Sequence, residues 1–144
     1  MRNNLTYKLN ESGKEPNEFE RVASNAYNVW VWKGFEDQAD TVLRGDARGE
    51  EKVYSWIERL ADRIPPGTDK VRRLEGFPCE EWNVWEIKPK PYRIAFVRIC
   101  GKHILVGYIW RKKGKSTDSV EIRKACEKMV ELIRKFMKEV KPCQ

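Results

Sequence analysis

Residues 82–115 constrain the fold of this chain more than any other stretch. They read WNVWEIKPKPYRIAFVRICGKHILVGYIWRKKGK, so apolar and β-branched residues are interleaved with basic ones. Pro89, Pro91 and Gly101 interrupt the stretch at turn positions. This pattern predicts three consecutive β-strands, and strands joined by short turns run antiparallel.

Five further elements are expected around these strands, each with an apolar face at strand or helix spacing. They are, in chain order, a strand at 27–32, helices at 35–43 and 50–64, a strand at 70–74, and a helix from 118 to 140. The predicted fold class is therefore α+β, an antiparallel β-sheet with an N-terminal helical pair and a C-terminal helix packed on it.

Length and patterning indicate one domain. A chain of 144 residues can bury a core without disulfides or a structural metal. Residues 25–144 are expected to form this domain, and the polar, aperiodic residues 1–24 a flexible extension. No apolar run approaches the roughly 20 residues that cross a bilayer, and the N-terminus lacks the apolar core of a signal peptide. A cytoplasmic protein without a membrane partner is expected.

The cysteines and the single histidine do not form a metal-binding pattern. The four cysteines lie far apart and no CxxC pair occurs. We predict reduced thiols packed as small apolar groups, and neither a metal nor another cofactor. The residues concerned are Cys79, Cys100, Cys126, Cys143 and His103.

Positive charge is concentrated in the strand-forming part of the chain. Residues 67–117 carry twelve Lys and Arg against five Asp and Glu, an excess equal to the net charge of +7 of the whole chain. Such a distribution is typical of a surface that binds a polyanion.

Pairing the turns assigns side chains to faces of the sheet. If Gly101 and Lys102 form a two-residue hairpin loop, Arg93 lies opposite Trp110. If Pro89 and Lys90 close the preceding hairpin, Glu86 lies opposite Arg93. One face would then carry Glu86, Lys88, Arg93, Tyr108, Trp110 and Lys112. The opposite, helix-covered face would carry Trp85, Ile87, Ile94, Phe96, Leu105 and Ile109.

The first of these faces has the chemistry of a single-stranded RNA-binding surface. Cations neutralise phosphates, and aromatic rings stack on unpaired bases. The residues predicted to bind RNA are Lys90, Tyr108, Trp110, Arg111, Lys113 and Lys115.

Metal-free cleavage of RNA would need a base for the 2′-hydroxyl, a cation for the phosphorane-like transition state, and an acid for the leaving oxygen. Arg93 suits the cation's role because its fork holds a phosphate bidentately. Lys88 or Lys112 could act as the base if neighbouring cations lowered its pKa. Glu86 is an alternative base, although an ion pair with Arg93 is its favoured use. These four residues are the catalytic candidates.

The series WEIK, YRIAFV, ILVGYIWRKK and EIRKA resembles the RelE/ParE toxin superfamily, and most closely its HigB-like, phage-derived branch. The resemblance covers residues 27–137. It implies the toxin of a type II toxin–antitoxin system, inhibited by a cognate antitoxin protein, which cleaves mRNA on the ribosome without a metal. Matched by position, Arg93 is the strand arginine, Lys88 a basic residue of the preceding strand, and Lys112 and Lys113 the lysines that close the last strand.

The sequence departs from the family pattern near its C-terminus. Many ribosome-dependent members carry a tyrosine or histidine there, whereas none follows Tyr108 in this chain. Two alternatives therefore stay open: a ParE-like toxin that inhibits DNA gyrase, and an RNA-binding derivative of the same fold without catalysis.

Overall fold

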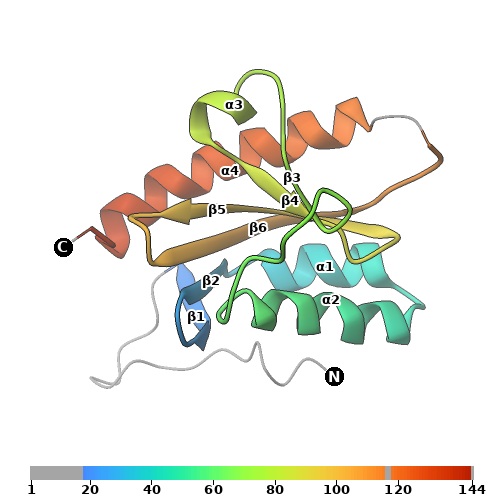
Figure 1. Ribbon diagram of the computed structural model, residues 1–144, viewed down its shortest axis with the longest axis horizontal. Coiled ribbons are helices and arrows are strands. Elements are labelled where there is room, and N and C mark those ends of the chain that lie inside the picture. The colour runs from blue at the N-terminus through green and yellow to red at the C-terminus, as the bar shows by residue number, and fades with distance from the viewer. Residues whose placement is uncertain (1–17, 116–117, 144) are drawn as a thin grey trace.

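The computed structural model describes residues 18–115 and 118–143, which form one mixed β-sheet with helices on both faces (Figure 1). Its six strands lie in the order β1-β2-β6-β5-β4-β3. The elements are β1 (Phe19–Ser24), β2 (Asn28–Trp32), α1 (Phe35–Leu43), α2 (Ala47–Arg59), β3 (Val71–Arg73), α3 (Cys79–Trp82), β4 (Trp85–Ile87), β5 (Tyr92–Ile99), β6 (His103–Arg111) and α4 (Ser119–Glu139). None of the described helices is long and apolar enough to span a membrane.

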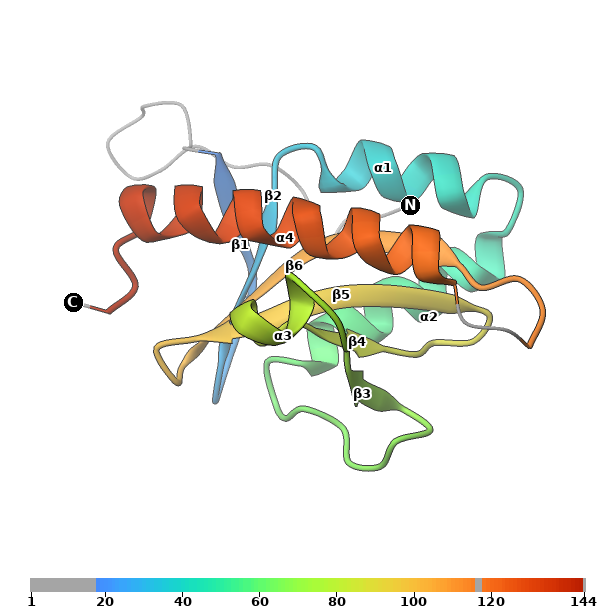
Figure 2. The same ribbon diagram turned by 90° about the horizontal axis from the view of Figure 1, so that it is seen from above.

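Two hydrophobic cores enclose the sheet from opposite sides. The helical pair α1 and α2 covers one face, and α4 crosses the other (Figures 1 and 2). Phe35, Ile57 and Ile94 belong to the first core, while Val97, Leu132 and Phe136 belong to the second. The face predicted to be open for RNA is therefore largely covered by α4.

The α+β class, the helical pair and the C-terminal helix are confirmed, but the sheet is not purely antiparallel. β2 pairs with β6 in parallel, with Val29 opposite Ile104. The crossover through the helical pair and the later strands makes this parallel pairing possible, because it returns the chain to the same end of the sheet.

Part of the expected N-terminal extension belongs to the sheet. β1 pairs antiparallel with β2, and Phe19 is only 2% exposed because its ring packs edge-on against Phe136 at 5.2 Å between centroids. The sequence pattern did not predict this strand because half of the residues in β1 are polar and its only large buried side chain is that of Phe19. The rest of the predicted extension, residues 1–17, lies outside the described residues.

The predicted pairing of Arg93 with Trp110 is confirmed, although the turn was assigned wrongly. Ile99 pairs with His103 across a three-residue turn, and a bulge at Gly107 restores the register. The bulge moves Leu105 to the α4 face, where it is fully buried, so its predicted place beside Ile109 is wrong. On the other side, Glu86 lies opposite Ala95 instead of Arg93. This shift of two residues leaves Glu86 on the predicted face.

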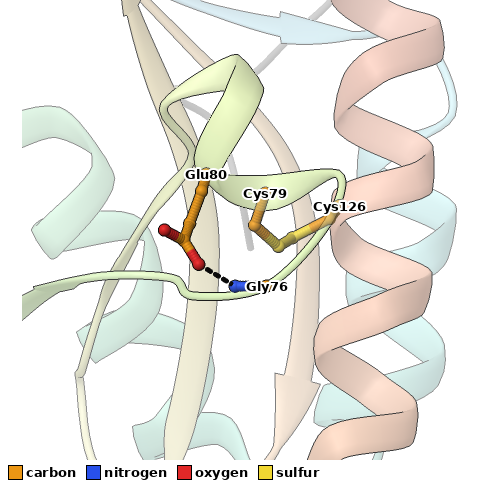
Figure 3. Close-up of a disulfide and its surroundings, with 4 residues drawn as sticks. All are labelled: Gly76, Cys79, Glu80 and Cys126. Carbon is orange, nitrogen blue, oxygen red and sulfur yellow. Dashed lines mark hydrogen bonds between the residues drawn. A yellow bond between two sulfur atoms is a disulfide. The ribbon is translucent and has the colours of Figure 1, made fainter.

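The prediction of reduced thiols is wrong, because the four cysteines form two disulfides. One joins Cys79 in α3 to Cys126 in α4 (Figure 3), with Cα atoms 5.2 Å apart. The other joins Cys100, in the β5–β6 turn, to Cys143 near the C-terminus, with Cα atoms 5.5 Å apart. Both distances are ordinary for disulfides. Sequence spacing could not show them, since each pair meets only when α4 lies on the sheet.

Candidate functional site

A small recess lies where β4, β5 and β6 meet the beginning of α4. Its volume is about 90 Å³, and most of its lining side chains are charged. Four are cationic and two are acidic. The lining residues are Arg72, Glu86, Arg93, Trp110, Lys112, Lys115, Asp118 and Ile122.

Glu86 lies at the centre of this charge cluster and is only 1% exposed. The Nε and Nη2 atoms of Arg72 lie 2.8 and 2.7 Å from its Oε2 atom. The Nε atom of Arg93 lies 3.7 Å from Oε1, which is an ion-pair distance but too long for a hydrogen bond. The predicted Glu86–Arg93 ion pair is therefore present, and Arg72 joins it. Two guanidinium groups compensate the burial of the carboxylate.

Arg93 directs a nearly buried positive charge into the recess. Its side chain is 11% exposed, and its Nη1 donates to the backbone oxygen of Tyr92 at 3.0 Å. Burial lowers the pKa of Arg93, and the nearby Glu86 carboxylate opposes this shift. A guanidinium nevertheless stays charged in proteins, so most of its five N–H donors are left for a ligand.

Lys88 adjoins the recess without lining it. Its Nζ donates to the backbone oxygen of Thr68 at 2.7 Å. Burial lowers the pKa of Lys88, Glu86 opposes the shift, and Arg72, Arg93 and Lys90 lower the pKa further. The direction is the one that a lysine acting in proton transfer requires.

The two predicted stacking residues do not offer open ring faces. Trp110 is 3% exposed, and its Nε1–H has no hydrogen-bond partner among the described residues. Tyr108 is half-buried, and its hydroxyl donates to Oε1 of Glu121 in α4 at 3.0 Å. Burial, together with Glu121, raises the pKa of Tyr108 to about 12. α4 covers both rings, which the strand pattern alone could not indicate.

The other predicted RNA-binding residues lie in different places. Lys115 lines the recess, and Lys113 is exposed two residues before it. Lys90 is exposed, and its backbone oxygen accepts from Nζ of Lys52 at 2.9 Å. Arg111 points to the opposite face, where its Nη1 lies 3.3 Å from the hydroxyl of Tyr92. Arg111 therefore lies away from the recess, because neighbouring residues of a strand alternate between faces, and its contact with RNA stays a prediction.

Three lining residues were not anticipated. Arg72 lies directly opposite Glu86 in the β3–β4 ladder, so pairing those two segments in the sequence would have found it. Asp118 and Ile122 line the recess only because α4 begins beside it. Asp118 Oδ2, like Trp110 Nε1, is buried and lacks a hydrogen-bond partner within residues 18–115 and 118–143.

Comparison with known proteins identifies a relative. No family model matches the chain. A protein of Aquifex aeolicus (strain VF5), described as uncharacterized, is 47% identical over 122 residues, which cover 83% of this chain and 90% of that protein. This chain therefore belongs to the same family as the Aquifex aeolicus protein.

Proposed function

We propose that this chain is a RelE-like toxin that cleaves mRNA, and that the recess around Glu86 is its active site. The observation that carries the proposal is the buried carboxylate of Glu86, which is ion-paired with Arg72 and Arg93 in a recess that Lys112 also lines. Cations gathered in a partly dry site stabilise a phosphorane far better than they would in water. The charge excess of residues 67–117 attracts the RNA to the same part of the molecule.

The Oε1 atom of Glu86 is the proposed base. Arg72 binds Oε2, while Arg93 stays 3.7 Å from Oε1. When an RNA phosphate takes the N–H donors of Arg93, Oε1 is left to accept the proton of the 2′-hydroxyl. The 2′-oxygen then attacks phosphorus, and the P–O5′ bond breaks to give a 2′,3′-cyclic phosphate and a free 5′-hydroxyl.

The basic residues have the two remaining roles. Arg93 and Lys112 stabilise the charge of the pentacoordinate phosphate. Lys88 supplies the proton for the leaving 5′-oxygen, because its lowered pKa makes its ammonium group a better acid. Tyr108 is unsuited to act as a base near neutral pH, because burial and Glu121 raise its pKa to about 12.

The resemblance to RelE-like and HigB-like proteins extends the proposal to partners. A cognate antitoxin would inhibit the toxin, and the mRNA would be presented by the ribosome. The basic strand ends at Lys112, Lys113 and Lys115 support contact with an RNA-rich partner.

The experiment is controlled expression followed by RNA analysis. Growth should stop and mRNA should shorten, while Arg93→Ala should relieve both effects and Arg44→Ala, at an exposed position outside the recess, should not. In vitro, an RNA with a single 2′-deoxy substitution at the cleavage position should resist cleavage. Intact mRNA with gyrase-linked DNA damage would refute the proposal in favour of a ParE-like toxin.

One observation favours a second candidate, an RNA-binding derivative without catalysis. Glu86 is held by two arginines, and no tyrosine or histidine follows Tyr108 in the sequence. Such a protein would bind single-stranded RNA with the wild-type recess but leave the RNA intact. Incubating the wild-type protein with labelled RNA separates the two cases, because the enzyme should cleave the RNA and lose this activity in Glu86→Gln, whereas the derivative should leave the RNA intact.

A further inference from the structure

A second, larger groove lies outside the recess, between α2 and the loop that leads to β3. Its volume is about 370 Å³, within the range of small-molecule sites. It is lined by Trp56, Arg59, Asp62, Arg63, Pro65, Pro66 and Lys70. The mechanism above uses none of these residues.

The lining of this groove combines an aromatic ring with exposed cations. Trp56 is half-buried and packs against the α1–α2 core. Arg59, Arg63 and Lys70 are exposed, and no carboxylate of residues 18–115 and 118–143 forms an ion pair with them. The one acidic lining residue, Asp62, accepts from Asn25 Nδ2 at 2.7 Å. The groove therefore presents a net positive charge beside a flat apolar surface.

From these observations we infer that the groove is a second subsite for single-stranded RNA, in which one base stacks on Trp56 and its phosphates contact Arg59, Arg63 and Lys70. Bases and phosphates alternate along a single strand of RNA. The tryptophan ring can stack on a base while the cations around it contact the neighbouring phosphates. The inference rests on the proposed function only for the identity of the nucleic acid.

The groove is connected to the recess through the edge of the sheet. Lys70 immediately precedes β3, and Arg72 of the recess lies two residues further, on the order of 7 Å along an extended chain. Lys88 bridges the two sites, since its Nζ binds the backbone of Thr68 in the groove's loop while its charge acts on Arg72 and Arg93. A strand whose phosphate occupies the recess could follow these cations to Trp56.

The test measures binding of labelled, uncleavable all-deoxy and 2′-O-methyl oligonucleotides by fluorescence anisotropy. An octamer should bind Trp56→Ala about tenfold more weakly than wild type, while Trp56→Phe, which keeps a stacking ring, stays within about threefold. Trp82→Ala, at a half-buried tryptophan outside both sites, is the matched control and should bind like wild type. A dinucleotide, which is too short to span both sites, should lose less affinity than the octamer does when Trp56 is replaced by Ala.

The cations are tested by salt dependence. Replacing Arg59 and Arg63 by Gln should reduce the slope of log K against log salt by roughly 1.4, because two phosphate contacts are lost. The Arg44→Gln, Arg48→Gln variant carries the same charge change away from the groove and should keep the wild-type slope.

Two results would overturn the inference. The first is equal octamer binding by wild type, Trp56→Ala and the double-Gln variant. The second is competition by polyglutamate as strong as by RNA, which would identify an acidic-protein site. Loss of cleavage in Arg93→Ala is a separate measurement, so the proposed function and this subsite can fail independently.

Discussion

Arg72 in β3 lies opposite Glu86 in β4. The Nε and Nη2 atoms of Arg72 lie 2.8 and 2.7 Å from Glu86 Oε2. The carboxylate is 1% exposed, whereas the arginine side chain is 46% exposed. Glu86 is the only buried charged residue in the described part of the chain. Arg72, in the short edge strand β3, thus holds this carboxylate in position.

Arg72→Met should destabilise the protein. The substitution keeps the aliphatic part of the side chain but leaves Glu86 with Arg93 alone, at 3.7 Å. We expect the free energy of unfolding in urea to fall by roughly 1–3 kcal/mol, because a buried carboxylate loses its charged hydrogen bonds. Arg44→Met, at an exposed position, should change it by less than about 0.5 kcal/mol. Equal stability of the two variants would show that water replaces Arg72.

The sequence predicted the strands and helices better than it predicted how they cover one another. Amphipathic spacing located α1, β2 and α4, because each buries one face. It could not show that α4 lies over the face with Arg93, since strands covered on both sides read as continuous apolar runs. β5, with the sequence YRIAFVRI, is such a strand.

The candidate site was predicted in part for related reasons. Arg93, Glu86 and Lys112 follow from alternation along the three strands of two hairpins, and an error in one turn was cancelled by the bulge at Gly107. Arg72 was missed because the three residues VRR of β3 are too few to show a period. Stacking by Trp110 was predicted from its residue type and its assigned face, and neither of these shows that α4 buries the ring.

Gly107→Ala should be destabilising through crowding. The backbone at Gly107 does not have a positive φ, but an added Cβ would meet Met129 Sδ and would lie 2.6 Å from Leu132 Cδ1. Overpacking of this fully buried contact should cost about 1–3 kcal/mol in chemical denaturation. Combining it with Leu132→Ala should cost less than the two single changes added together, because the second change removes one of the two obstructing atoms. Additive costs would contradict the crowding explanation.

Removing the Cys79–Cys126 disulfide should lower stability more than removing Cys100–Cys143. Their sequence separations of 47 and 43 residues give similar chain-entropy terms, of roughly 2–4 kcal/mol. Cys79 and Cys126 are 2% and 0% exposed, so their replacement by Ala also leaves a void. Urea unfolding of the two double-Ala variants, without reductant, measures the difference. A larger loss for the exposed Cys100–Cys143 pair would mean that anchoring the C-terminus matters more than core packing.

Stability should fall between neutral and mildly acidic pH because of His103. Its Nδ1 accepts from Trp30 Nε1 at 3.2 Å, which requires the neutral imidazole. Burial lowers the pKa of His103, the backbone of Pro142 opposes this, and Lys102 and Arg21 lower the pKa further. The folded state therefore binds fewer protons than the unfolded state. The stabilisation is present above the unfolded pKa, about 6.5, and is lost as pH falls through the folded pKa.

The sole histidine allows a direct measurement of this titration. An NMR titration of its ring protons should give a pKa below about 6.5 in the folded protein. His103→Phe keeps an aromatic ring beside Phe136 and should flatten the pH dependence of unfolding in this window. A folded-state pKa above the unfolded value would contradict the expected direction of the shift.

Trp110→Phe should separate packing from ligand binding in the recess. The indole Nε1–H is buried and has no partner within the described part of the chain, so its loss removes a donor whose burial costs about 1–3 kcal/mol. The free energy gained by removing this unpaired donor offsets the packing lost with the smaller ring. The free energy of unfolding should therefore stay within about 1 kcal/mol of wild type. RNA binding should nevertheless weaken several-fold if the N–H donates to a phosphate oxygen in the recess. Unchanged affinity together with unchanged stability would show that Trp110 is only a packing residue, and the recess would then bind RNA through its cations alone.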